Sequence, residues 1–157
     1  MRIAKTRTDE SKGTPEEGVL REFVGYNVKR AYMALQPAAQ AGMAEYDLRV
    51  PSFSCLSVIV ANPGIAPSEL AECLKMERSN IVVVIDELES RELVNRTKST
   101  KDRRRYALSA TMRGRRLHEK AVAAIHRREN HLLRSLSAEE QATLVELLNK
   151  VEAGSTK

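Results

Sequence analysis

The sequence predicts a mainly α-helical fold with one small β-hairpin. Apolar residues recur at the 3.6-residue spacing of a helix in several segments. One short basic segment instead holds two strand-like runs separated by a polar, turn-prone stretch. The composition agrees, because the 157 residues include no Trp and only two Phe, so the core must be aliphatic. A chain of this length forms one domain with a core of useful size.

Two short helices joined by a tight turn are predicted within residues 67–90. Pro67 suits the first turn of a helix, where its missing N–H removes no hydrogen bond. The run 81–85 is β-branched and favours a strand by propensity, but its flanks extend the helical pattern, so we expect a helix over 78–90. The apolar residues at helical spacing are Leu70, Ala71, Leu74, Ile81, Val84, Ile85 and Leu88. This is the helix-turn-helix layout, whose second helix lies in the DNA major groove.

The start of that second helix carries side chains suited to base edges. An Arg bonds guanine bidentately, an Asn bonds adenine, and a Val methyl group contacts the methyl group of thymine. The residues expected to face DNA there are Arg78, Ser79, Asn80, Val82 and Val83.

A basic hairpin is predicted directly after these helices. Residues 93–97 and 104–108 are the strand-like runs, and polar residues separate them. Between residues 96 and 116 the chain has nine cations and one anion, which favours contact with phosphate over a solvated loop. An Arg at the hairpin tip can enter a narrow minor groove, and an Asp can hold an Arg in place. The hairpin residues expected at DNA are Lys98, Lys101, Asp102, Arg103, Arg104 and Arg105.

This segment resembles the MarR family of bacterial transcriptional regulators. The matching features are SELAECL, RSNIVVVIDELESRELVNR, DRR at 102–104, and Thr111 followed three residues later by Gly114. The family pattern has Leu where this chain has Ala110, and it favours polar residues at the positions of Val82 and Val83. The resemblance implies a winged helix-turn-helix with N- and C-terminal dimerisation helices. It also implies that Arg104 reaches into the minor groove, with Asp102 as its buttress.

The flanking segments are expected to form the dimerising frame. Residues 1–17 lack periodicity and are predicted to be a disordered tail, followed by one domain over 18–153. We expect dimerisation helices at about 18–43 and 117–153, and the winged unit at about 51–116. The terminal helices cannot bury their apolar faces alone in so small a chain. A symmetric dimer is therefore expected, which presents two recognition helices to a palindrome.

Local signals predict where several elements begin. An extended link is expected over 46–50, and Ser52 is expected at or beside the N-cap of a helix over 52–61. Ser137 and Glu140 have the spacing of a capping box that opens the last helix.

The resemblance also implies a small-molecule effector. Members of the family bind phenolic or aromatic carboxylate compounds, sometimes as coenzyme A thioesters, between the dimer helices and the DNA-reading unit. Such a ligand releases DNA by favouring a dimer whose recognition helices do not fit the operator. By position, the residues expected to line the pocket are Tyr26, Arg30, Tyr46, Arg49, Phe53 and His118.

The sequence therefore predicts a DNA-binding repressor that an aromatic acid or its thioester releases from a palindromic operator. Two alternatives stay open: a constitutive DNA-binding protein without an effector, and a thiol-based redox-sensing repressor.

Enzymes and metal sites are disfavoured. The chain has no glycine-rich phosphate loop and no paired carboxylates in an apolar setting, and His118, His126 and His131 lack metal-ligand spacing. Cys55 and Cys73 are too few for a disulfide framework and are predicted to be small buried apolar residues. No segment suits a membrane span or a signal peptide, so we expect a cytoplasmic protein without a cofactor.

Overall fold

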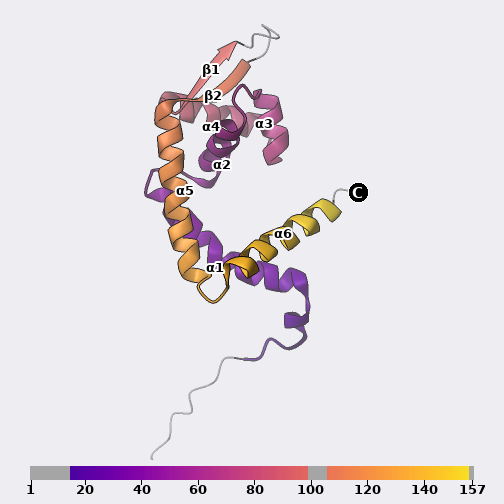
Figure 1. Ribbon diagram of the computed structural model, residues 1–157. Coiled ribbons are helices and arrows are strands. Elements are labelled where there is room, and N and C mark those ends of the chain that lie inside the picture. Colours follow the sequence, from indigo (N-terminus) through magenta and orange to yellow (C-terminus); the bar gives the residue numbers. More distant parts are fainter. Residues whose placement is uncertain (1–14, 99–105, 156–157) are drawn as a thin grey trace, which may run out of the picture. The chain divides into compact units, whose positions relative to one another are not determined.

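The computed structural model describes residues 15–98 and 106–155. The mainly α-helical fold with one hairpin is confirmed. The elements in chain order are the 3-10 helix η1 (Gly18–Glu22), α1 (Val24–Ala44), α2 (Val50–Ala61), α3 (Pro67–Leu74), α4 (Arg78–Ser90), β1 (Val94–Lys98), β2 (Tyr106–Ala110), α5 (Met112–Leu132) and α6 (Ala138–Gly154) (Figure 1).

Contacts divide the chain into two units, which meet within α1 between Met33 and Ala34. The first unit contains η1 and the first half of α1. Phe23, whose backbone is extended (φ −87°, ψ 124°), separates these two elements, where one continuous helix over 18–43 was expected. The helix α1 continues through Pro37 to Ala44.

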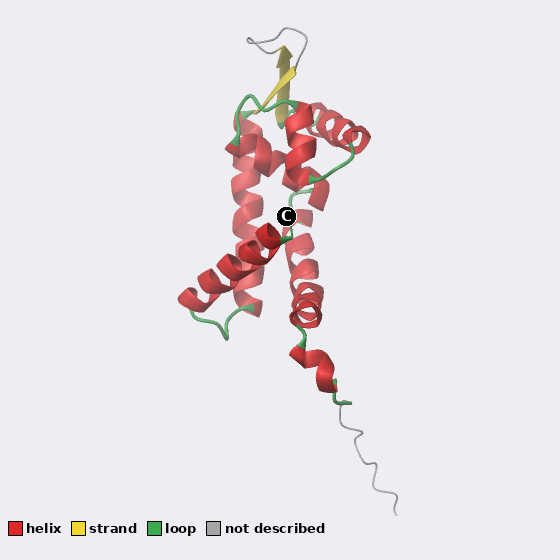
Figure 2. Ribbon diagram, turned by 90° about the vertical axis from the view of Figure 1, so that its right-hand side faces the viewer, coloured by secondary structure: helices red, strands yellow, loops and turns green. Residues whose placement is uncertain are grey.

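The second unit has its main core where α2, α3, α4 and the hairpin meet (Figures 1 and 2). Burying an aliphatic side chain of this kind stabilises a fold by about 1.5–3 kcal/mol. The large side chains that are almost completely buried there are Leu56, Ile59, Leu70, Ile81, Ile85, Leu88, Leu93, Val94 and Leu108. A smaller cluster of Met43, Leu48 and Ala121 joins the end of α1 to α5.

The β-branched run in α4 is helical, as predicted. Ile81, Val84, Ile85 and Leu88 are buried, whereas Val82 and Val83 are exposed, so the burial follows the period of a helix. The helical penalty of a β-branched residue is a few tenths of a kcal/mol. Burial of one aliphatic side chain outweighs that penalty several-fold.

The hairpin lies slightly later in the chain than predicted. The strands β1 and β2 pair antiparallel, with Val94 opposite Ala110 and Lys98 opposite Tyr106. Residue Leu93 is instead part of the turn after α4, since its N–H donates to the carbonyl of Leu88 (2.9 Å). The other edge of β2 forms an isolated bridge to Ile65, which follows α2.

The link before α2 and the start of α2 differ from expectation. The helix begins at Val50, its N-cap is Arg49, and no side chain caps it. Residues 46–47 form a turn rather than an extended link, and Asp47 has a left-handed backbone (φ 54°). Ser52 is therefore not the cap. It lies inside the helix and is fully buried. Pro51, just before it, occupies one of the first helical positions, where its missing N–H removes no hydrogen bond.

The helices α5 and α6 both begin with side-chain caps, of which the sequence predicted the second. At the start of α5, Thr111 Oγ1 accepts a hydrogen bond from the N–H of Gly114 (2.9 Å). At the start of α6, Ser137 and Glu140 form the predicted capping box. None of the described helices is long and apolar enough to cross a membrane.

Candidate functional site

The turn between α3 and α4 sets the exposure of the first turn of α4. Lys75 ends α3 in a left-handed conformation (φ 51°), and Glu77 begins α4 without a side-chain cap. Arg78, Ser79 and Asn80 follow, and all three are exposed. An uncapped helix N-terminus has N–H groups that can bind phosphate. The three residues expected to read DNA here therefore lie where a nucleic acid can reach them.

The two valines predicted at DNA are also exposed. Val82 and Val83 lie one turn further along α4, on its solvent side. Val82 borders a hollow of about 270 Å³ between the starts of α3 and α4 and strand β2. Other residues around this hollow include Pro67, Arg78 and Tyr106.

Of the predicted hairpin residues, the structure describes Lys98, at the end of β1, where it is exposed. The other five lie outside the described residues: Lys101, Asp102, Arg103, Arg104 and Arg105. Their roles at DNA stay predictions.

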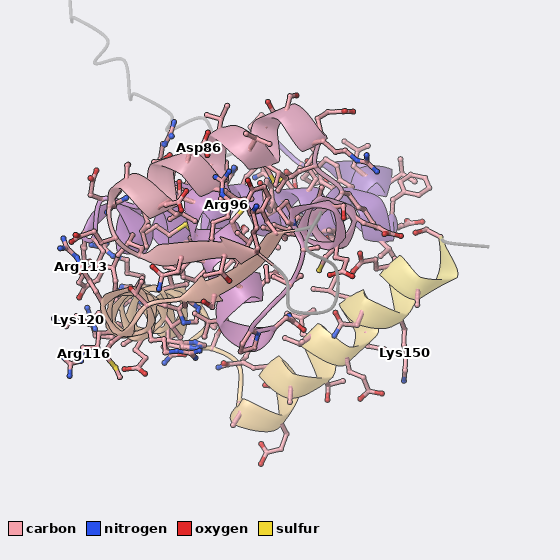
Figure 3. All side chains as sticks on the ribbon, turned by 90° about the horizontal axis from the view of Figure 1, so that it is seen from above. Asp86, Arg96, Arg113, Arg116, Lys120 and Lys150 are labelled. Carbon is pink, nitrogen blue, oxygen red and sulfur yellow. The ribbon has the colours of Figure 1, made fainter. Side chains whose placement is uncertain are left out.

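Arg96, one of the cations of the basic segment, forms ion pairs with acidic residues of α4. Its guanidinium forms ion pairs with Asp86 and with Glu89 (3.3 Å), and it lies over the ring of Tyr106 (5.8 Å). Figure 3 shows Arg96 and Asp86 side by side. This cation therefore ties β1 to α4. The composition of the basic segment did not predict this tie, because Asp86 and Glu89 lie on α4 and not in the segment.

The start of α5 adds further positive charge near the hairpin. Arg113, Arg116 and Lys120 are exposed and project from the same helix (Figure 3). Arg113 lies 3.5 Å from Glu92, but both side chains are largely in solvent. Such an exposed pair contributes less than about 1 kcal/mol and leaves the cation accessible.

Two of the predicted effector residues, Phe53 of α2 and His118 of α5, meet directly. Their rings stack with centroids 5.6 Å apart. Nε2 of His118 lies 3.0 Å from the hydroxyl of Ser57, a neighbour that the sequence did not single out. Burial lowers the pKa of His118, and the nearby Glu119 carboxylate partly opposes that shift. The neutral imidazole is thus favoured in this aromatic and polar cluster.

Two more predicted effector residues, Tyr46 and Arg49, lie in the loop before α2. The Tyr46 side chain packs, like Phe53, against the smaller core cluster. Arg49 borders a hollow of about 420 Å³ whose other lining residues include Met43, Leu48 and Val50.

Glu87 connects α4 to the loop before α2 and to α2 itself. Arg49 donates to Glu87 Oε2 (2.7 Å), and the buried hydroxyl of Ser52 donates to Glu87 Oε1 (3.1 Å). One turn later, Arg91 donates to the carbonyls of Asp47 (2.7 Å) and Tyr46 (3.2 Å). The sequence did not single out Glu87, because an acidic residue on the solvent side of an amphipathic helix is common.

The remaining predicted effector residues, Tyr26 and Arg30, belong to the first unit. Tyr26 donates its hydroxyl to Glu17 Oε1 (2.7 Å), and Arg30 lies 3.4 Å from the same oxygen. The hydrogen bond lowers the pKa of Glu17 and raises that of Tyr26. The six predicted residues thus fall into two groups, one in each unit.

The cysteines differ from each other in exposure. Cys55 is fully buried, as predicted, and burial raises the pKa of its thiol to about 11. Cys73 is exposed, so the prediction that it is buried was wrong. Its position on α3 lies off the face that carries Leu70 and Ala71 into the core. Among the described residues, no group of three or more His, Cys, Asp or Glu could hold a metal ion.

Comparisons with known proteins agree with this arrangement. The sequence model of the MarR family matches residues 48–106. A protein of Thauera aromatica, named as the transcriptional regulator proposed for the hcr operon, is 30% identical over 149 residues, which are 89% of this chain and 90% of that protein.

Two solved structures are similar over most of their length. The transcriptional repressor CouR bound to a 23-mer DNA duplex has a TM-score of 0.80 and 32% identity, over 89% of this chain and 99% of that one. CouR from Rhodococcus jostii RHA1 bound to p-coumaroyl-CoA has a TM-score of 0.73 and 27% identity, over 85% and 94% of the two chains.

Proposed function

The chain belongs to the MarR family of transcriptional regulators, and we propose that it is a dimeric repressor released from a palindromic operator by a small aromatic acid or its coenzyme A thioester. It is a DNA-binding regulator rather than an enzyme. The observation that carries the proposal is the exposed first turn of α4 beside the hairpin.

Operator recognition is assigned to α4 and the hairpin. Arg78, Ser79 and Asn80 have donors that suit base edges in a major groove. The hairpin, with Lys98 and Arg104, supplies phosphate and minor-groove contacts, and Asp102 orients Arg104. CouR, which is similar in sequence and fold, has been solved on a DNA duplex, which supports this mode of binding.

The effector site is assigned to the second-unit residues Phe53 and His118 and to Arg49, which lies one helical turn before Phe53 at the start of α2. The stacked rings suit an aromatic ligand, and the Arg49 guanidinium suits a carboxylate or a phosphate. Tyr46 is included in this proposal, and the roles of Tyr26 and Arg30 of the first unit stay sequence predictions. CouR binds p-coumaroyl-CoA, a thioester of a phenolic acid, which supports the proposed class of ligand.

Glu87 offers a physical route from the effector to the operator. Arg49 donates to Glu87 of the recognition helix, so a ligand anion that attracts Arg49 competes with that carboxylate. Loss of the contact loosens α4 from the start of α2. The ligand thereby favours dimers in which the two recognition helices do not fit the two half-sites together.

The exposure and pKa of the cysteines give little support to the redox-sensing alternative. A sensor needs an accessible thiol with a lowered pKa, and Cys55 is buried with its pKa raised to about 11. Cys73 is exposed on α3, so the redox-sensing alternative depends on Cys73. We expect diamide to leave operator affinity unchanged in both the natural protein and Cys73→Ser. A loss of affinity in the natural protein alone would establish a thiol switch.

A gel shift on the DNA upstream of the protein's own gene tests the proposal. The reaction contains excess random DNA and a panel of aromatic acids and their coenzyme A thioesters. We expect a shift that resists the competitor and that one compound releases. Arg49→Gln should bind the same DNA but need a higher concentration of that compound, whereas Arg127→Gln, on the far part of α5, should respond normally.

Each other outcome has a distinct meaning. A shift that no compound releases would favour the constitutive DNA-binding protein. A shift that random DNA abolishes would contradict sequence-specific repression itself.

A further inference from the structure

We propose that Val82 and Val83 read the C5 methyl groups of thymine, so that each operator half-site is specified in part by apolar contact. This inference rests on the proposed function, because it needs α4 to lie in the major groove. It goes further by naming the chemical feature of the operator that the middle of the helix recognises.

The two valines are exposed where a helix would ordinarily carry polar residues. Val82 is 46% exposed and Val83 is 65% exposed, although the buried face of α4 already has Ile81, Val84 and Ile85. Valine is also a poorer helix former than Ala, Lys or Glu, because its β-branch restricts the side chain. Neither exposure nor propensity favours valine at these positions in the unbound protein, and apolar contact with a bound partner is the role that we infer for them.

The rest of this face offers few hydrogen-bond donors. From residue 81 to residue 90, α4 contains no Lys, Arg, Asn or Gln. The carboxylate of Asp86, one turn after Val82, is paired with Arg96 of β1. Polar readout is therefore concentrated in the first turn, at Arg78, Ser79 and Asn80, and the next turn presents methyl groups.

The apolar surface continues beyond the valines. Val82 borders the hollow of about 270 Å³ that Ala66, Pro67, Ile81 and Tyr106 also line. Its lining residues come from α3, α4 and β2, and they include Arg78, which is proposed to contact DNA. Val82 thus belongs to a mostly apolar hollow beside Arg78, and Val83 follows it as an exposed apolar residue of α4.

The major groove offers one prominent apolar group to such a surface. Thymine carries a C5 methyl group there, whereas the other base edges present hydrogen-bond donors and acceptors. Removing one buried methyl group from an apolar contact weakens binding about fourfold. Contact with two methyl groups would therefore change affinity roughly 15-fold in each half-site.

The test is thymine-to-uracil substitution, which removes the methyl group and keeps every hydrogen-bonding group. An operator is first selected from random duplexes with the natural protein, and its protected bases are mapped. Each thymine in the half-sites is then replaced by uracil, and affinity is measured at fixed salt. We expect a loss of about fourfold or more at the thymines beneath α4, and no change at thymines outside the protected region.

A matched pair of variants assigns the effect to these side chains. Val82→Thr/Val83→Thr keeps the branched shape but replaces a methyl group with a hydroxyl at each position. We expect it to bind thymine and uracil operators equally, while its unfolding midpoint stays near that of the natural protein because both side chains are exposed. Lys150→Gln, which changes an exposed charged residue of α6, should retain the full preference for thymine.

Several results would overturn the inference while leaving the proposed function intact. One is equal affinity of the natural protein for thymine and uracil operators. A second is a selected operator that has no thymine in its half-sites. A third is a Val82→Thr/Val83→Thr variant that still prefers thymine over uracil. If selection returns no preferred sequence at all, the proposed function fails as well, so the two failures are distinguishable.

Discussion

His118 has a neutral imidazole at neutral pH for a physical reason. It lies against Phe53 and Ser57, and burial lowers its pKa. The folded protein therefore binds this proton less readily than the unfolded chain does. Its contribution to stability is complete above the unfolded pKa of about 6.5 and is lost as pH falls below that value, toward the lower pKa of the folded state.

We predict that the natural protein loses more stability between pH 7.5 and pH 5.5 than His118→Gln does. The measurement is the urea midpoint at each pH for the two proteins. His126→Gln, an exposed histidine on the same helix, should follow the natural protein. Parallel losses in the natural protein and His118→Gln would contradict the prediction.

Gly114 sets how closely α5 approaches the turn before β1. A Cβ atom at this position would lie 2.0 Å from the carbonyl oxygen of Leu93, which is backbone and cannot move aside cheaply. The same carbonyl accepts the N–H of Thr111 (3.0 Å), and Thr111 caps the helix through the N–H of Gly114. The Thr-x-x-Gly spacing thus joins the hairpin to α5.

We predict that Gly114→Ala destabilises the fold by about 3 kcal/mol or abolishes folding, because the added methyl group forces β1 and α5 apart. Gly154→Ala is the control, since nothing lies within 4 Å of its would-be Cβ. The free energy of unfolding in urea compares them. Equal stability of the two variants would show that α5 can shift without loss.

Ser52 and Glu87 join α2 to α4, because the fully buried hydroxyl of Ser52 donates a hydrogen bond to the Glu87 carboxylate. Glu87→Ala leaves that hydroxyl without its acceptor and should destabilise the protein by about 1–3 kcal/mol. Ser52→Ala/Glu87→Ala removes both partners and should recover part of the loss. Arg49→Ala should destabilise the fold by less than about 1 kcal/mol, because the Arg49 side chain is 76% exposed.

Urea unfolding of these variants measures the coupling. Additive losses in the double variant would show that the buried hydroxyl does not depend on Glu87.

At the scale of the whole molecule, α6 is the face that we expect a second copy to cover. None of the described residues of α6 is buried in the protomer. Its exposed apolar side chains are Leu144, Val145, Leu147, Leu148 and Val151. Exposed apolar surface of this extent on one helix marks an interaction site. In the proposed symmetric dimer, a second copy covers this helix and two α4 helices face a palindrome.

We predict that Leu147→Glu/Leu148→Glu is monomeric and binds the full palindrome no more tightly than a half-site. Light scattering after gel filtration gives the mass. Lys150→Gln, which changes an exposed charged residue of the same helix (Figure 3), should remain dimeric. A dimeric double variant would mean that α6 does not form the interface.

Periodicity was sufficient to predict most of the helices of this fold. The buried set of α4 matches the predicted apolar spacing, and the Ser137 capping box lies where its spacing placed it. The start of α2 was missed because Ser52 is used for a tertiary hydrogen bond to a residue 35 positions away. Cys73 was placed in the core because single positions at the edge of a helical face depend on neighbouring elements.

Residue types in the sequence were sufficient to propose candidate site residues, whose roles stay predictions. The structure shows that Arg78, Ser79 and Asn80 are exposed and that Phe53 stacks on His118. The ion pair of Arg96 with Asp86 and the contacts of Glu87 were not predictable, because each joins elements whose packing angle no local pattern specifies.

The ratio of affinities for a selected operator and for random DNA, measured by anisotropy at one physiological salt concentration, decides whether this protein reads sequence through α4. The natural protein should prefer its operator by about a thousandfold or more. Asn80→Ala should reduce that ratio by lowering operator affinity, with little change in affinity for random DNA. A natural protein that binds both DNAs within a few-fold, or an Asn80→Ala variant that weakens both equally, would contradict the assignment of base recognition to α4.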